Sequence, residues 1–78
     1  MAENPKYIIF EGPLCQEVVI FSSVMTHSNV AICIGHEVVS AGFVEFSEHP
    51  QAYGESVSLG IKSRPEDTAR ILRHLNIE

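Results

Sequence analysis

The sequence predicts a small α+β domain, in which an antiparallel sheet of about four strands carries a C-terminal amphipathic helix on one face. Two observations predict this class. Residues 52–61 alternate between large apolar side chains and small ones, a period of two that is typical of a strand with one buried face. Directly afterwards, Ser63 and Glu66 have the S-x-x-E spacing of a helix capping box, in which each side chain accepts a hydrogen bond from the other residue's backbone N–H. The 78 residues suit a single domain, 1–78, with the order β-β-α-β-β-α.

The first two strands are expected at residues 6–11 and 15–21. Gly12 and Pro13 lie between them, and this pair favours a turn because proline cannot donate to a strand ladder. Each segment contains three or more consecutive apolar residues, which indicates strands covered on both faces and placed centrally in the sheet. We expect residues 1–5, before the first strand, to be disordered.

Residues 22–35 fit either a short helix or a strand, because several of their apolar residues are β-branched. Gly35 favours the helix, since glycine commonly ends helices in a left-handed conformation. Ser28 or Thr26 would then cap the N-terminus. We expect the helix, and the strand is the alternative.

The third and fourth strands are expected at residues 37–46 and 52–62, joined by a loop. If Phe46 pairs with Ala52, one face of the pair carries large apolar side chains and the other carries small ones. The small-residue face consists of Ser40, Gly42, Gly54, Ser56, Ser58 and Gly60, bordered by Val38, Val44 and Phe46. Residues 64–75 then place apolar side chains at i, i+3, i+4 spacing, which predicts an amphipathic helix lying on a sheet face.

Charge and hydropathy exclude several partners. Residues 1–61 carry one lysine and seven acidic residues, a balance of −6, whereas nucleic acid requires cations that replace its counterions. No apolar run approaches the ~18 residues that span a membrane, and the first residues lack the features of a signal peptide. We therefore expect a cytoplasmic protein without nucleic-acid or membrane partners.

The cysteines and histidines match no familiar site. Cys15 and Cys33 lie outside any C-x-x-C spacing, and we expect reduced thiols packed as small hydrophobic residues. His27, Cys33 and His36 are of metal-ligating type, but their spacing fits no zinc motif and the chain offers no second paired cluster of ligands. We expect neither a metal nor a cofactor. A cysteine nucleophile with a histidine base likewise has no support from spacing.

Glu55 is the exception in the alternating strand, because its carboxylate falls on the large-residue face. A carboxylate there must be paired, be protonated or reach water at the sheet margin. A bridge to Arg70 or Arg73 is one structural alternative. The functional alternative is a small enzyme or ligand-binding domain that uses Glu55 with a histidine or cysteine.

Three strings resemble a group of small uncharacterised proteins encoded by bacteriophages and prophages. These are Val-Ser-Ala-Gly-Phe at residues 39–43, Tyr-Gly-Glu-Ser-Val-Ser-Leu at 53–59 and Lys-Ser-Arg-Pro-Glu-Asp at 62–67. The resemblance covers residues about 38–70 and includes no catalytic motif. It implies the cytoplasm of a bacterial host cell and a protein that acts by contact.

We expect a non-enzymatic protein-interaction module that forms a homodimer. Two short helices cannot cover both faces of a sheet whose first strands are apolar on both sides, and glycines in strands suggest close approach of another surface. A closed two-fold contact is the commonest use of such a patch. The alternatives are that the small residues permit strong sheet twist, or that residues 22–35 fold over them. The expected interface residues are Ser40, Gly42, Val44, Phe46, Gly54, Ser56, Ser58 and Gly60.

Overall fold

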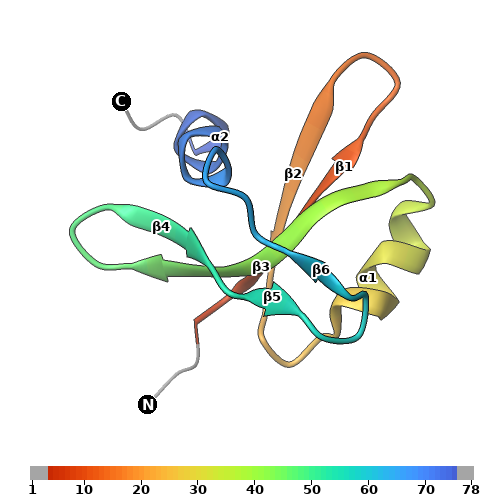
Figure 1. Ribbon diagram of the computed structural model, residues 1–78, viewed down its shortest axis with the longest axis horizontal. Helices are drawn as coiled ribbons and strands as arrows, with labels where there is room; N and C mark the ends of the chain where they lie inside the picture. Colours follow the sequence, from red (N-terminus) through yellow and green to blue (C-terminus); the bar gives the residue numbers. More distant parts are fainter. Residues whose placement is uncertain (1–3, 76–78) are drawn as a thin grey trace.

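The computed structural model describes residues 4–75. Its elements, in chain order, are β1 (Lys6–Glu11), β2 (Gln16–Phe21), α1 (His27–Ile34), β3 (Val38–Phe46), β4 (Pro50–Tyr53), β5 (Glu55–Ser56), β6 (Ile61–Lys62) and α2 (Asp67–His74) (Figure 1). The first four strands form an antiparallel sheet in the order β2-β1-β3-β4, and β5 and β6 form a separate two-stranded hairpin. The predicted α+β class, with a four-stranded sheet and a C-terminal helix on one face, is confirmed.

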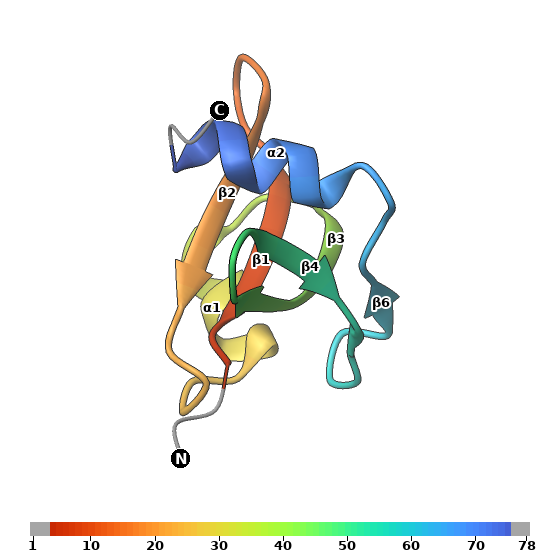
Figure 2. The same cartoon turned by 90° about the vertical axis from the view of Figure 1, so that its left-hand side faces the viewer.

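The sheet lies between two covering layers (Figures 1 and 2). On the side of α2, one buried apolar cluster contains Tyr7, Ile9, Val18, Val44 and Ile71. On the other side, α1 and the β5–β6 hairpin cover a second cluster, which contains Ile8, Val30 and Ala41 with Leu59 and Ile61 packed against it. The expectation that one sheet face lacks cover is therefore wrong. Residues 22–35 do fold over the sheet, but on the face that carries Ala41 and Phe43. Ser40 and Gly42 lie on the face that α2 covers, so the alternative that residues 22–35 fold over these small residues is also wrong.

Helix α1 has the caps that its sequence suggests. Thr26 has an extended backbone, and its Oγ1 accepts a hydrogen bond from the backbone N–H of Asn29 at 3.1 Å. Gly35 ends the helix with a φ of 73°, in the left-handed region that glycine adopts without a steric penalty, and its N–H donates to the carbonyl oxygen of Ala31. The predicted helix in residues 22–35 is confirmed, with Thr26 as its cap.

The single long strand predicted at residues 52–62 is wrong. Gly54 has a φ of 78° and turns the chain out of the sheet after β4. The chain then forms β5, a tight turn in which the N–H of Gly60 donates to the carbonyl oxygen of Ser56 at 2.8 Å, and β6. The backbone N–H of Ser63 returns to the carbonyl oxygen of Gly54 at 3.0 Å, which closes the excursion. Two glycines in an alternating pattern therefore mark turns rather than a flat strand face.

The predicted register of β3 and β4 is also wrong. Phe46 pairs with Pro50 and Val44 with Ala52, so the connecting loop has only three residues. Pro50 is compatible with this register because β4 is an edge strand, where the missing N–H is not needed for the ladder.

Helix α2 begins later than the capping box predicts. Its first residue is Asp67, and Glu66 makes no side-chain capping bond. The carboxylate of Asp67 accepts from the backbone N–H of Arg64 at 2.9 Å, while the N–H of Asp67 donates to the carbonyl oxygen of Arg64 at 3.0 Å. These reciprocal bonds lie one residue beyond the predicted pair, Ser63 and Glu66. The shift follows from Pro65, because a residue before proline disfavours helical geometry and a cap at Ser63 would require it of Arg64.

Part of the N-terminal segment is held by the sheet. The carbonyl oxygen of Pro5 accepts from the N–H of Val44 at 2.9 Å, and the side-chain amide of Asn4 donates to the hydroxyl of Tyr53 at 2.9 Å. The expected disorder of residues 1–5 is wrong for these two residues, and residues 1–3 lie outside the described part. Within residues 4–75, no helix combines the length and the apolar character needed to cross a membrane.

Loss of the α1 cap gives the first prediction. Thr26→Ala should lower the free energy of unfolding by about 1 kcal/mol, because the N–H of Asn29 then loses its acceptor. Ser28→Ala, two residues on, is the matched control, since Ser28 accepts no such capping bond. Urea unfolding of both variants checks this, and equal effects would contradict the assignment of the cap.

Candidate functional site

The predicted small-residue interface is not a surface of this domain. Four of its residues are buried within the fold, namely Ser40, Gly42, Val44 and Ser56. A Cβ on Gly42 would collide with the carbonyl oxygen of Tyr53, so glycine is needed there for the approach of the chain's own β4. The other four, Phe46, Gly54, Ser58 and Gly60, are exposed but lie on separate segments. Ser56 is 0% exposed, so a large charged side chain at this position would disrupt the fold itself.

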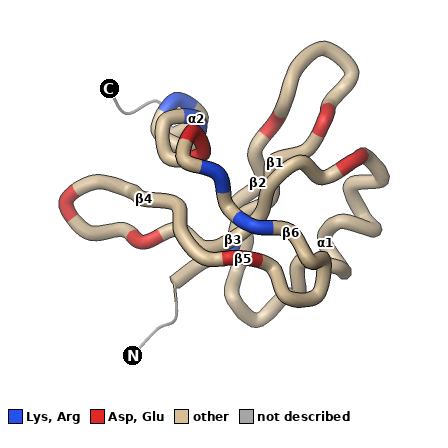
Figure 3. The backbone as a smooth tube through the Cα atoms, in the orientation of Figure 1, with Lys and Arg blue, Asp and Glu red and all other residues tan. Residues whose placement is uncertain are grey.

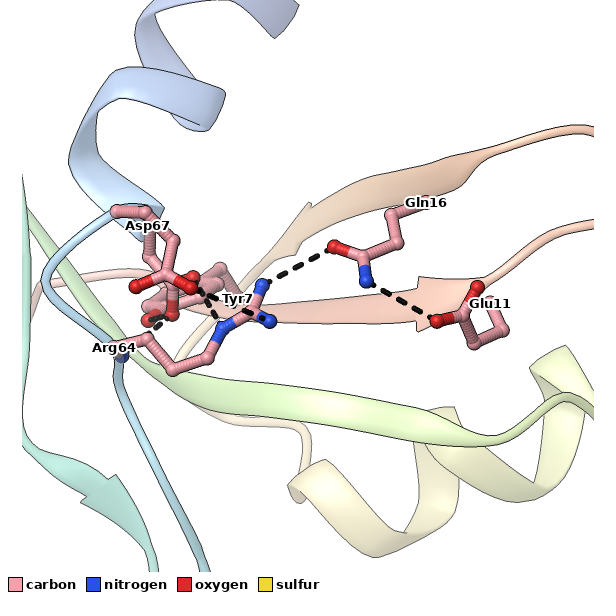
Figure 4. Close-up of polar contacts among 6 residues, drawn as sticks. Tyr7, Glu11, Gln16, Arg64 and Asp67 are labelled. Carbon is pink, nitrogen blue, oxygen red and sulfur yellow. Dashed lines mark hydrogen bonds and ion pairs between the residues drawn. The ribbon is translucent and has the colours of Figure 1, made fainter.

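A buried carboxylate ties the sheet to the C-terminal helix (Figure 4). Asp67 is 0% exposed, and its Oδ2 accepts from the hydroxyl of Tyr7 at 2.5 Å and from the backbone N–H of Arg64 at 2.9 Å. Its Oδ1 accepts from Nε of Arg64 at 3.0 Å. The Arg64 guanidinium continues to the side-chain oxygen of Gln16 at 3.3 Å, and the Gln16 amide donates to Glu11 at 3.1 Å.

This network has a structural role. Burial, together with the hydrogen bond to the Asp67 carboxylate, raises the pKa of Tyr7 far above its ordinary value, against smaller opposing effects of Ser63 and Arg64. The hydroxyl is thereby fixed as a donor, and the carboxylate is saturated by three donors. The sequence contains no spacing signal that joins Tyr7 to Asp67, because they are sixty positions apart.

An aromatic row crosses the sheet on its α1 face. The strand registers align Phe21 of β2, Lys6 of β1, Phe43 of β3 and Tyr53 of β4. Phe43 stacks on Tyr53 with ring centroids 5.6 Å apart. His27, at the start of α1, makes edge-on contacts with Phe21 and Phe43, at centroid distances of 5.5 and 5.8 Å. The imidazole of His27 therefore packs against the aromatic side chains of this row.

His27 is the buried titratable group of this region. The side chain is 4% exposed, and its Nε2 lies 2.9 Å from the carbonyl oxygen of Gly42. A carbonyl oxygen can only accept, so Nε2 carries the proton, and in the neutral ring Nδ1 is an acceptor. Burial lowers the pKa of His27 despite the bond to Gly42, and the nearby Lys6 ammonium lowers it further. The neutral form, with a free lone pair on Nδ1, is therefore favoured.

A cavity of about 270 Å³ opens beside His27. We call it the His27 pocket, and it is lined by Lys6, Thr26, His27, Phe43, Glu55, Val57 and Ser58. Glu55 is exposed on the β5–β6 hairpin, in agreement with the prediction that its carboxylate could reach water at the sheet margin. It lies on the side of α1 rather than α2. The structure therefore brings Glu55 and a histidine into one cavity, and a bridge to Arg70 or Arg73 is not formed.

The two cysteines and the other histidines do not line the His27 pocket. Cys15 and Cys33 are both exposed, so the expectation that they pack in the core is wrong. A second cavity, of about 340 Å³ between β2 and α2, is lined by Cys15 and His74 together with Arg70 and Arg73. Within residues 4–75, no three side chains of histidine, cysteine, aspartate or glutamate gather as a metal site.

The two edges of the sheet differ. The backbone N–H of Glu11 donates to the carbonyl oxygen of Glu37, so the backbone groups of Glu11 point toward β3. Because backbone direction alternates along a strand, the N–H and C=O groups of Phe10, Ile8 and Lys6 point toward β2. In β2, the partners of these three residues point inward. The backbone groups of Gln16, Val18 and Ile20 consequently point outward, and no other strand of the described chain pairs with them. The expectation that β2 is central is wrong, because it forms an open edge.

The opposite edge is closed. The outward positions of β4 are Pro50 and Ala52, since the intervening residues face β3. Pro50 has no N–H, and the N–H of Ala52 donates to the hydroxyl of Thr68 on α2 at 3.0 Å. No backbone donor of this edge is left for another strand.

Alkaline pH should expose the role of Tyr7. Below pH 10 the hydroxyl is protonated in the folded and unfolded states, whereas above it only the unfolded chain loses the proton, so the free energy of unfolding should fall as pH rises beyond 10. Tyr7→Phe should lose about 2 kcal/mol at neutral pH through the missing bond to Asp67, but it should lack this alkaline component. Urea unfolding from pH 7 upward checks this, and parallel pH profiles for the two proteins would contradict it.

Acid pH should expose the role of His27. Because its folded pKa lies below 6.5, the unfolded chain takes up a proton first, and the free energy of unfolding should fall as pH drops through 6.5. His27→Gln retains a donor for Gly42 but cannot titrate, so it should flatten the profile between about pH 7 and 5. His36→Gln, at an exposed histidine, is the control. A flattening by the control rather than by His27→Gln would refute the assignment.

None of the known protein families matches this chain, and neither a curated protein nor a solved structure is similar to it. The resemblance to phage and prophage proteins therefore stays a prediction.

Proposed function

We propose that the protein is a non-enzymatic interaction module that self-associates through β2. Two copies would pair their β2 strands antiparallel about a two-fold axis, joining two four-stranded sheets into one. The observation that carries this proposal is the difference between the open edge at β2 and the closed edge at β4. The β2 edge thus takes the place of the flat small-residue face as the proposed interface, and the proposed assembly is still a homodimer.

An open strand edge is a template for another strand. The outward N–H and C=O groups of Gln16, Val18 and Ile20 form a row that a second strand can pair with, and β2 contains neither the proline nor the lysine that commonly blocks such pairing. A two-fold axis at Val18 would set Glu17 opposite a valine rather than another glutamate, which avoids like-charge contact.

Charge modulates this association. Each copy has a net charge of −5, and most acidic residues lie on the strands and loops outside β6 and α2 (Figure 3). Two acidic copies repel one another at low ionic strength, so salt should strengthen the dimer. A phage or prophage setting in the bacterial cytoplasm remains part of the proposal, supported by the resemblance of residues 38–70.

A ligand-binding domain is the second candidate function. The specific observation in its favour is that Glu55 and His27 line one cavity. This site is on the α1 face of the sheet, whereas self-association uses the β2 edge, so the two functions are compatible.

Light scattering and amide hydrogen exchange test the self-association. At micromolar concentration the mass should exceed that of the 8.6 kDa monomer and should rise with salt. In the dimer, the outward amides of Val18 and Ile20 should exchange slowly, and dilution should remove this protection. The inward amides of Val19 and Phe21 are internal controls, because their ladder bonds to β1 exist in the monomer as well.

Proline substitutions supply a matched pair of variants. Ile20→Pro removes an outward N–H and should give a folded monomer, whereas Val19→Pro, at a residue of similar burial, removes a ladder bond to Ile8 and should destabilise the fold. A wild-type mass of 8.6 kDa, or outward amides that exchange freely at every concentration, would refute the proposed dimer.

A further inference from the structure

We propose that the His27 pocket binds the guanidinium group of an arginine side chain on a partner protein. This inference goes beyond self-association, because the pocket is lined by none of the three residues whose outward backbone groups form the open β2 edge, Gln16, Val18 and Ile20. It follows from the polar atoms that the pocket leaves without partners, from its size and from the side chains around its mouth.

Most polar groups of the pocket already have partners. The ammonium of Lys6 donates to the carbonyl oxygen of Met25 at 2.8 Å, and Oγ1 of Thr26 accepts from the N–H of Asn29. The hydroxyl of Ser58 lies 3.4 Å from that of Ser56. These groups are held by the fold itself, which leaves the imidazole and the carboxylate.

Both remaining groups are acceptors. Nδ1 of His27 has no hydrogen-bond partner within residues 4–75. Among these residues, Oγ of Ser40 is the one side-chain polar atom that is both fully buried and without a partner. Nδ1, which also lacks a partner, is therefore accessible to solvent. The carboxylate of Glu55 forms no ion pair within the described chain. A ligand that satisfies both must therefore be rich in N–H donors.

Charge and shape favour a guanidinium. A carboxylate in an acidic chain favours a cationic ligand. Lys6 is the one positively charged side chain that lines the pocket, and its ammonium already donates to the carbonyl oxygen of Met25. The guanidinium presents five N–H donors in a plane, so it can reach two separate acceptors, and it packs well on an aromatic ring such as Phe43. A volume of about 270 Å³ is below the ~300–1,000 Å³ of typical small-molecule pockets, which suits a single side chain.

The mouth of the pocket indicates a protein rather than free arginine. Val57, 86% exposed, lines the pocket, and Val24 and Met25 are exposed immediately before Thr26 in the chain. Tyr53, also exposed, stacks on Phe43. Exposed apolar side chains on, or directly next to, the residues that line a pocket for a charged anchor are typical of a protein interface, in which they exclude water from the central contact.

An NMR titration of the full chain tests the ligand class. The probes are acetyl-arginine-amide and acetyl-citrulline-amide, which have nearly the same shape but differ in charge. The arginine probe should shift the signals of His27, Glu55 and Ser58, and the citrulline probe should bind at least about tenfold more weakly. Equal binding of the two probes, or shifts confined to other regions, would overturn the proposal.

Matched glutamate variants test the site. Glu55→Gln should weaken binding of the arginine probe about tenfold. Glu48→Gln, another exposed glutamate outside the pocket, should leave it unchanged. Equal affinities in both variants would refute the role of Glu55. Light scattering of Glu55→Gln should give the wild-type mass, so loss of arginine binding and loss of self-association are separately visible.

A third comparison tests the source of the guanidinium. The peptide acetyl-Leu-Arg-Leu-amide should bind more tightly than acetyl-Gly-Arg-Gly-amide, because leucines can contact Val57 and Met25, and Val57→Ser should remove that difference. Free L-arginine that binds more tightly than either peptide would show a site for the amino acid and would overturn the protein partner.

Discussion

The buried carboxylate of Asp67 is the constraint on which the arrangement of the domain depends. A charge without solvent is tolerated only where donors surround it, and here the donors come from β1 through Tyr7 and from the linker through Arg64. The carboxylate thus fixes where α2 begins and how it lies on the sheet. That position brings Thr68 to the N–H of Ala52 and closes the β4 edge. The hydrogen bonds of Asp67 therefore hold α2 where it covers one sheet face and also occupies the outward N–H of the β4 edge.

The opposite face is covered by two smaller pieces. Gly54 turns the chain out of the sheet, and the backbone bond from Ser63 to Gly54 returns it, so the β5–β6 hairpin joins α1 over the second apolar cluster. The His27 pocket lies where these two pieces meet above Phe43. The two proposed activities use the His27 pocket and the open β2 edge, which this covering structure leaves accessible.

The two buried titratable centres differ in a way that separates structure from binding. Asp67 is fully buried and already accepts hydrogen bonds from three donors of the fold, so it has little capacity for a ligand. His27 is favoured in its neutral form, with one nitrogen bonded to Gly42 and the other available as an acceptor beside Glu55. Burial without saturation is the property expected of a binding site, and only the second centre has it.

Local patterns in the sequence were sufficient for the fold class, for the β1–β2 hairpin and for α1 between Thr26 and Gly35, because turns, caps and strand periodicity act over a few residues. They failed at residues 52–62, where alternation resembles a strand but positive φ at Gly54 and Gly60 makes turns. The flat interface failed with that strand, since Ser40, Gly42 and Ser56 are enclosed by the chain's own segments. The joining of Tyr7 to Asp67, the seating of His27 on the aromatic row and the choice of β2 as the open edge were decided only by tertiary structure. Each depends on which distant segments become neighbours, and contacts across sixty residues leave no periodic signal in the chain.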